Sequence, residues 1–106
     1  MDLPAIIALY FDADGRGDAD ALLNTFAADA VVEDENARHE GEAVIRRWWT
    51  AAKEATQYIA EPLDAVRDGD VVHVRANIRG TFPGSPITLT HSFTVKDDKI
   101  VKLEIH

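Results

Sequence analysis

Residues 23–49 read LNTFAADAVVEDENARHEGEAVIRRWW and contain the signals of three successive elements. The apolar residues 30–32 predict a short strand, and residues 33–36 predict an acidic turn after it. Gly41 then begins a helix that runs to about Gln57, because apolar residues recur along one of its faces. The members of this apolar face are Val44, Ile45, Trp48, Ala52 and Ala55.

Two shorter helices are predicted before this stretch. The first begins near Pro4, which suits a first helical turn, and Asp2 is expected to cap it. It ends at the glycines of residues 15–17, and Asp18 is the expected N-cap of the second helix. The predicted buried stripes are Leu3, Ile6, Ile7 and Tyr10 in the first helix and Leu22, Leu23 and Phe26 in the second.

The second half of the chain alternates apolar and polar residues, which predicts strands at 58–67, 71–81, 87–95 and 100–105. Short polar turns between these strands indicate consecutive hairpins and therefore an antiparallel meander. Helices that precede such a sheet indicate an α+β fold with the helices on one face. A long helix against a strongly twisted sheet of four or five strands leaves a half-open cone, whose mouth suits a small-molecule pocket.

Composition excludes several classes of function. The 106 residues predict one domain, residues 1–106, and the 46% hydrophobic and 28% charged residues are typical of globular proteins. The net charge of −8 disfavours nucleic acid and anionic membranes, and the lack of cysteine excludes disulfides and zinc–sulfur sites. No apolar run is long enough to span a membrane. No basic segment precedes the first apolar stretch, so residues 1–14 are not expected to be a signal peptide. We therefore expect a cytoplasmic protein.

Residues 23–49 resemble the nuclear transport factor 2-like superfamily and, within it, the SnoaL-like and ketosteroid isomerase-like proteins. Their pattern is a helix ending in F-A-x-D-A, here residues 26–30, and a strand ending in E-D, here residues 33–34. A glycine then opens a helix with two aromatic residues, here 41–49, and residues 93–105 resemble the last hairpin of the family. The resemblance implies a cone-shaped α+β fold with a long helix and two shorter N-terminal helices on a curved, mainly antiparallel sheet. It also implies a homodimer.

The resemblance assigns Asp34, in the E-D pair, as a general base that moves a proton along the substrate. A carboxylate that faces a dry pocket is suited to this step. The alternatives are an exposed loop acid and a pocket-lining residue without catalytic turnover. The resemblance also places Tyr10 as a donor to the substrate oxygen, a role that suits a neutral phenol. The alternative for Tyr10 is a core aromatic, because it belongs to the apolar stripe of the first helix.

His91 falls near the place where the isomerases have a protonated aspartate, and it shares strand parity with Phe93 and Val95. It is therefore expected to face the helices. A histidine there can donate a hydrogen bond near neutral pH, although it departs from the isomerase pattern and counts against steroid isomerisation. The alternative is a buried histidine bonded to the backbone or to water.

The remaining expectations concern the pocket wall and the absence of bound groups. Trp48 rather than Trp49 is predicted to face the pocket, because it continues the apolar face of the long helix. The predicted wall residues are Trp48, Tyr58, Phe26 and Phe93. Asp12, Asp14, Asp18 and Asp20 have a spacing similar to a calcium loop, but Arg16 and Leu23 occupy ligand positions. We expect no metal and no cofactor.

Two functions follow as hypotheses. In the first, a SnoaL-like, cofactor-free enzyme binds a small apolar carbonyl compound, and Asp34 moves a proton next to the carbonyl while Tyr10 and His91 hold the enolate oxygen. In the second, the same cone is a non-catalytic small-molecule-binding or dimerisation domain. A protein-binding relative of nuclear transport factor 2 is a third, weaker alternative, because the sequence shows no exposed apolar stripe.

Overall fold

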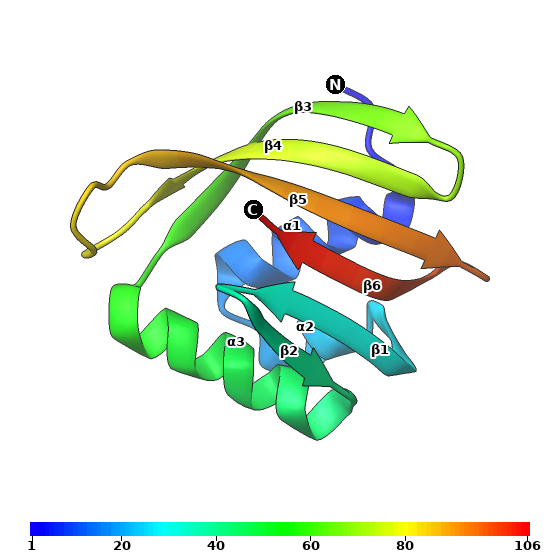
Figure 1. Cartoon of the computed structure of the whole chain (residues 1–106), viewed down its shortest axis with the longest axis horizontal. Coiled ribbons are helices and arrows are strands. Elements are labelled where there is room, and N and C mark those ends of the chain that lie inside the picture. Colours follow the sequence, from blue (N-terminus) through cyan, green and yellow to red (C-terminus); the bar gives the residue numbers. More distant parts are fainter.

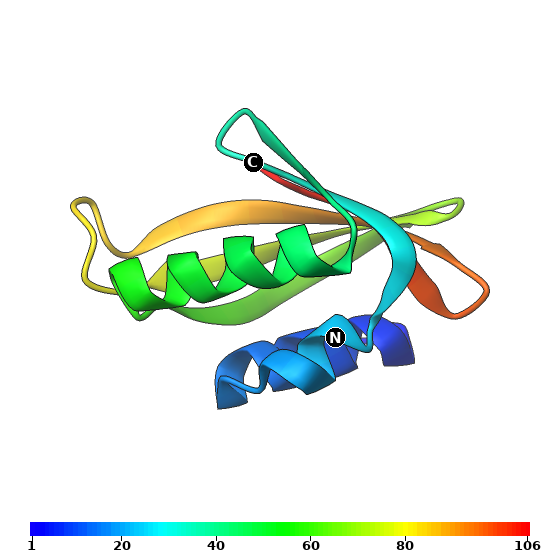
Figure 2. The same ribbon diagram turned by 90° about the horizontal axis from the view of Figure 1, so that it is seen from below.

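Three helices pack on one face of a curved six-stranded sheet in the computed structural model, which describes residues 1–106 (Figures 1 and 2). The helices are α1 (Ala5–Arg16), α2 (Ala19–Leu23) and α3 (Glu42–Thr56). The strands are β1 (Phe26–Asp34), β2 (Ala37–Glu40), β3 (Ile59–Asp68), β4 (Val71–Arg79), β5 (Ile87–Lys96) and β6 (Lys99–Ile105). This arrangement confirms the predicted α+β cone.

The strand order is β2-β1-β6-β5-β4-β3, and the sheet is not closed. Strands β3 to β6 form the predicted antiparallel meander. The pair of β1 and β6 is parallel, which joins the first hairpin to the end of the meander. None of the three helices has the length and apolar character needed to cross a membrane.

The region after residue 25 differs from the prediction in three ways. Phe26 begins strand β1 instead of ending the second helix, and β1 continues through Asp34. Only Glu35 and Asn36 form the turn, both with positive φ as tight hairpin turns require. Strand β2, whose residues are mostly polar and exposed, has no counterpart among the predicted elements. Its pairing with β1 comes from backbone hydrogen bonds, which leave no apolar pattern in the sequence.

The helix ends mostly follow the predicted signals. Asp18 caps α2, since its carboxylate accepts a hydrogen bond from the Ala21 amide at 3.1 Å. Gly17 ends α1 in the left-handed conformation with φ 68°. The predicted cap Asp2 is wrong, because α1 begins at Ala5 and its N-cap is Pro4, with no side-chain hydrogen bond. Asp2 lies too far ahead of the first free amides to reach them.

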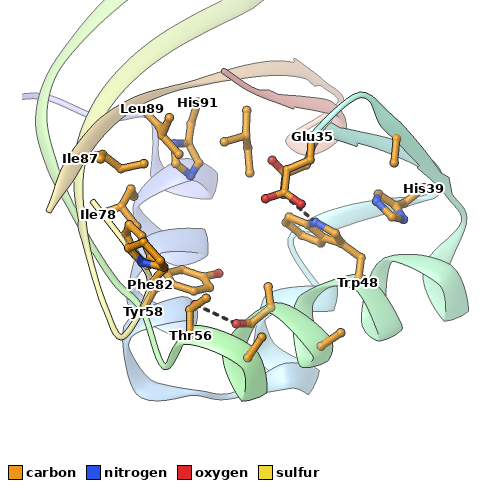
Figure 3. Close-up of a pocket in the computed structure, with 17 residues that line it drawn as sticks. Glu35, His39, Trp48, Thr56, Tyr58, Ile78, Phe82, Ile87, Leu89 and His91 are labelled. Carbon is orange, nitrogen blue, oxygen red and sulfur yellow. Dashed lines mark hydrogen bonds between the residues drawn. The ribbon is translucent and has the colours of Figure 1, made fainter. Parts of the chain in front are cut away.

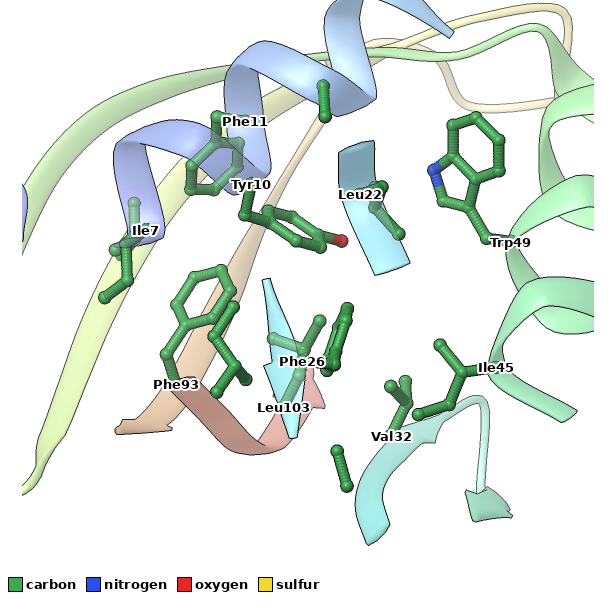
Figure 4. Close-up of a cluster of buried hydrophobic side chains, with 14 of the residues drawn as sticks. Ile7, Tyr10, Phe11, Leu22, Phe26, Val32, Ile45, Trp49, Phe93 and Leu103 are labelled. Carbon is green, nitrogen blue, oxygen red and sulfur yellow. The ribbon is translucent and has the colours of Figure 1, made fainter. Parts of the chain in front are cut away.

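The core lies between the helices and the inner face of the sheet (Figure 4). The alternating apolar residues of β4 face this core, and all four are buried: Val72, Val74, Ala76 and Ile78. Aromatic rings fill the centre, with Tyr10 packed edge-on against Phe11, Phe26 and Phe93 at centroid distances of 5.2, 6.0 and 5.1 Å. This aromatic group holds α1 against the sheet.

Candidate functional site: a cavity between α3 and the sheet

A cavity of about 700 Å³ lies between α3 and the inner face of the sheet (Figure 3). Of its 17 lining residues, 11 are hydrophobic, so most of its wall is apolar with a few polar groups. The end of β1 and the turn after it supply the acidic part of the lining, and α3, β4, β5 and the loop before β5 supply the apolar part. The polar side chains of the lining are Asp34, Glu35, His39, Trp48, Thr56, Tyr58 and His91.

Asp34 is the last residue of β1 and is half-buried, in contrast to the exposed loop acid of the alternative interpretation. The indole Nε1 of Trp48 donates a hydrogen bond to its Oδ2 at 3.0 Å (Figure 3). No protein hydrogen bond is made to Oδ1. The carboxylate is therefore held from one side by α3 while its second oxygen remains free to contact a ligand.

His91 lies on β5, lines the cavity as the strand parity predicted, and is only 4% exposed. Burial, with a smaller contribution from His106, lowers the pKa of its imidazole to about 4. The ring is therefore neutral near pH 7, with one nitrogen as donor and the other as acceptor. Its Nδ1 is buried with no hydrogen-bond partner in the protein, so the alternative of a backbone-bonded histidine does not hold for this atom.

A buried polar network beside the cavity was missed by the sequence analysis. Asp14 of α1 is 1% exposed, and its Oδ1 accepts hydrogen bonds from the Tyr58 hydroxyl at 2.7 Å and from Trp49 Nε1 at 2.8 Å. Lys53 Nζ lies 3.4 Å from the same oxygen. Asp14 follows Ile7 by two turns on the buried face of α1. An acid at that position was the signal available in the sequence.

Tyr58 therefore has a polar role that the prediction of an apolar wall did not include. Its ring lines the cavity near Thr56 and Phe82 (Figure 3), while its hydroxyl donates to Asp14. Lys53 Nζ lies over the Tyr58 ring, 3.7 Å from its centre, in a cation–π contact. Burial is the main cause of a raised pKa for the Tyr58 phenol, so the proton stays on its oxygen.

Three predicted site residues do not line the cavity. Tyr10, Phe26 and Phe93 are buried in the core, and Tyr10 is 1% exposed. Its edge-on contacts with the other two rings place Tyr10 among the core aromatics, which was the alternative interpretation for this residue. Of the two tryptophans, Trp48 lines the cavity as predicted, and Trp49 packs in the core.

No three histidine or acidic side chains come together in a geometry suited to a metal ion.

Residues 7–103 match the family model of the SnoaL-like domain. This chain belongs to the SnoaL-like domain family. No curated protein sequence matches the chain.

Solved structures share the fold of this chain over nearly its whole length. A candidate polyketide cyclase from Sinorhizobium meliloti is 61% identical, with a TM-score of 0.98 over 100% of this chain and 97% of that chain. A protein with a ketosteroid isomerase-like fold from Catenulispora acidiphila, in complex with trimethylamine, is 23% identical, with a TM-score of 0.83 over 99% of this chain and 86% of that chain. TerC, co-crystallised with polyporic acid, is 18% identical, with a TM-score of 0.82 over 95% of this chain and 87% of that chain. The last two likenesses concern the fold.

Proposed function

We propose that this SnoaL-like protein is a cofactor-free enzyme that transfers a proton next to the carbonyl group of a small apolar compound. Asp34 would be the base of this isomerisation or cyclisation. The observation that supports the proposal is a half-buried carboxylate with one oxygen held by Trp48 and the other free, in the lining of a largely apolar cavity. An apolar surrounding strengthens the interactions of such a base with a polar substrate.

The chemistry requires one proton to leave carbon and one oxygen to accept negative charge. Asp34 Oδ1 takes the proton from the carbon beside the carbonyl, and the electrons of that C–H bond move onto the carbonyl oxygen. His91 donates its N–H to this oxygen, as a neutral donor that keeps its own proton. Asp34 then returns the proton to another carbon. In a cyclisation, the carbanion instead attacks a second carbonyl carbon, the π electrons of that carbonyl move onto its oxygen, and the resulting alkoxide takes the proton back from Asp34.

Tyr10 does not take part in this proposal, because it does not line the cavity. Tyr58 does not replace it as a donor, because its hydroxyl donates to Asp14. Stabilisation of the developing enolate therefore rests on His91.

The candidate polyketide cyclase from S. meliloti supports a cyclisation, because ring closure of a polyketide begins with proton removal next to a carbonyl. Trimethylamine and polyporic acid, found with two neighbours of the same fold, support a small-molecule ligand for the cavity.

The test is deuterium incorporation next to the carbonyl of α-tetralone in D2O, followed by proton NMR. Wild-type protein should accelerate the exchange, and Asp34→Asn should reduce that acceleration by about a hundredfold or more, the usual contribution of a general base. Asp97→Asn is the matched control, since Asp97 is an exposed acid in the turn between β5 and β6. Equal exchange by Asp34→Asn and wild type would contradict the proposal.

A non-catalytic small-molecule-binding domain is the second candidate. The observation that favours it is that no phenol donor accompanies the His91 imidazole to share the charge of an enolate, because the Tyr58 hydroxyl donates to Asp14. Saturable binding of α-tetralone without any acceleration of exchange by the wild-type protein would support this candidate.

We also propose a cytoplasmic homodimer that forms through the outer face of the sheet. Val66 of β3 supports this surface, because it is 63% exposed and pairs with His73 on the face opposite the helices. Sedimentation equilibrium of the wild type and of Val66→Lys tests it, and a monomeric wild type would contradict it.

A further inference from the structure

We propose that the cavity selects ligands by their hydrogen-bond donors, and that a ligand hydroxyl donates to the phenolic oxygen of Tyr58. The ligand class is a flat, uncharged ring system with at least one hydroxyl group. The inference rests on the proposed function in so far as both place the ligand in the same cavity.

The donors of the cavity lining are already used inside the protein. Trp48 Nε1 donates to Asp34 at 3.0 Å, and the hydroxyl of Thr56 donates to the backbone oxygen of Ala52 at 2.9 Å (Figure 3). The hydroxyl of Tyr58 donates to Asp14 at 2.7 Å. A hydroxyl and an indole each have only one hydrogen to donate. These three side chains therefore have no hydrogen left for a ligand.

Acceptors, in contrast, remain available. The carboxylates of Asp34 and Glu35 belong to the lining, and the oxygens of Thr56 and Tyr58 keep lone pairs after donating their hydrogens. No lysine or arginine lines the cavity, and only two imidazoles can still donate. A ligand that supplies hydroxyl hydrogens matches this surface, whereas a carboxylate would meet two negative charges without a cation.

Tyr58 determines the selectivity because its hydroxyl proton is held in a hydrogen bond to Asp14 and does not point toward the ligand. Asp14 is a fully buried carboxylate, and a hydrogen bond from a phenol to a carboxylate is stronger than one to a neutral acceptor. Lys53 Nζ lies 3.4 Å from the same Asp14 oxygen and forms an ion pair with it. Turning the Tyr58 hydroxyl toward a ligand would leave this buried oxygen with one partner fewer. Asp14 thus acts as a positioning residue for the Tyr58 proton.

The experiment compares three derivatives of α-tetralone that differ at one ring position, which bears a hydroxyl, a methoxy or a carboxylate group. Dissociation constants are measured by isothermal titration calorimetry at neutral pH. Wild-type protein should bind the hydroxyl derivative about tenfold more tightly than the methoxy derivative, the size of one hydrogen bond, and the carboxylate most weakly. Tyr58→Phe keeps the ring and should reduce the hydroxyl preference about fivefold or more.

Tyr10→Phe is the matched control, since it removes a phenol that is buried outside the cavity, and it should leave the preference unchanged. Asp14→Leu frees the Tyr58 proton and should shift the preference toward the methoxy derivative. Equal affinity of the wild type for the hydroxyl and methoxy derivatives would overturn the inference, and so would binding of neither. An unchanged preference in folded Tyr58→Phe would also overturn it.

These outcomes are separate from those of the proposed function. Asp34→Asn should reduce catalysed exchange about a hundredfold or more. Addition of Tyr58→Phe to Asp34→Asn should still lower the preference for the hydroxyl derivative. A wild type that prefers the hydroxyl ligand through Tyr58 but catalyses no exchange would refute the enzyme and leave this inference intact. Exchange that depends on Asp34, without any hydroxyl preference, would refute this inference and leave the proposed enzyme intact.

Discussion

Replacement of Asp14 by alanine is expected to lower the free energy of unfolding by about 3–5 kcal/mol, the usual effect of removing one partner from a buried ion pair. The change removes the acceptor of two short hydrogen bonds, from Trp49 Nε1 and from the Tyr58 hydroxyl, and the counter-ion of Lys53. A buried donor without a partner costs about 1–3 kcal/mol. Trp49 bears this cost fully because it is buried in the core, whereas Tyr58 lines the cavity, where water can reach it.

Urea unfolding followed by circular dichroism measures this effect, and thermal unfolding should show a decrease of about 10 °C or more. Asp12→Ala is the matched control, because Asp12 is an exposed acid on the same helix and its pair with Arg16 is solvent-screened. Adding Lys53→Met to Asp14→Ala should recover part of the loss, since no half-buried ammonium then lacks a counter-ion. A loss below about 1 kcal/mol for Asp14→Ala, similar to that of Asp12→Ala, would refute the reasoning.

Three further predictions concern other parts of the molecule. Trp48→Phe keeps the apolar wall but removes the donor to Asp34, and it should slow catalysed deuterium exchange about tenfold with little change in ligand affinity. The pKa of His91 is about 4 in the folded protein against 6.5 ordinarily, so the unfolded chain binds more protons between these values. Stability from His91 is therefore complete above pH 6.5 and is lost as pH falls toward 4, by about 3 kcal/mol in urea unfolding, and His91→Phe should flatten this dependence. Gly80→Ala should destabilise the protein, because its Cβ would lie 2.6 Å from the Thr56 backbone oxygen, whereas Gly15→Ala in open space within α1 should stabilise it by about 0.5–1 kcal/mol.

Each of these predictions has a result that would contradict it. Exchange by Trp48→Phe at the wild-type rate would show that the indole does not position the base. An acid-induced loss of stability that is as large in His91→Phe as in the wild type would assign that loss to other groups. For the glycines, equal midpoints of thermal unfolding for Gly80→Ala and wild type would show that the loop before β5 can move away from α3.

Much of the fold could be predicted from local patterns of apolar and polar residues in the sequence. Helix α3 begins after Gly41 and ends before Gln57 as predicted, because its apolar face recurs with the period of the helix. The alternation in β4 identified its buried face, since strand residues alternate between the two faces of a sheet. Strand β2 was missed because backbone pairing, rather than burial, holds it in the sheet.

The candidate site was predicted less completely, and the reason is geometric. Periodicity shows that Tyr10 and Phe93 face inward, but it does not show whether an inward side chain meets another ring or an open space. The aromatic contacts of α1 decide this, and they leave both residues in the core. Asp34 and His91 were found because each lies on a strand whose inward face the sequence pattern or the family resemblance indicated.

The sequence by itself determined the types of most elements, the helix caps at Asp18 and Gly17, and the inward face of the meander, because these depend on residues close together in the chain. Only the tertiary structure decided that Asp14 of α1, Lys53 of α3 and Tyr58 before β3 form one buried network. Their sequence separation hides the contact, because a buried charge becomes tolerable only when partners from distant segments converge on it. The same convergence determines which way the Tyr58 proton points, and with it the chemistry that the cavity offers a ligand.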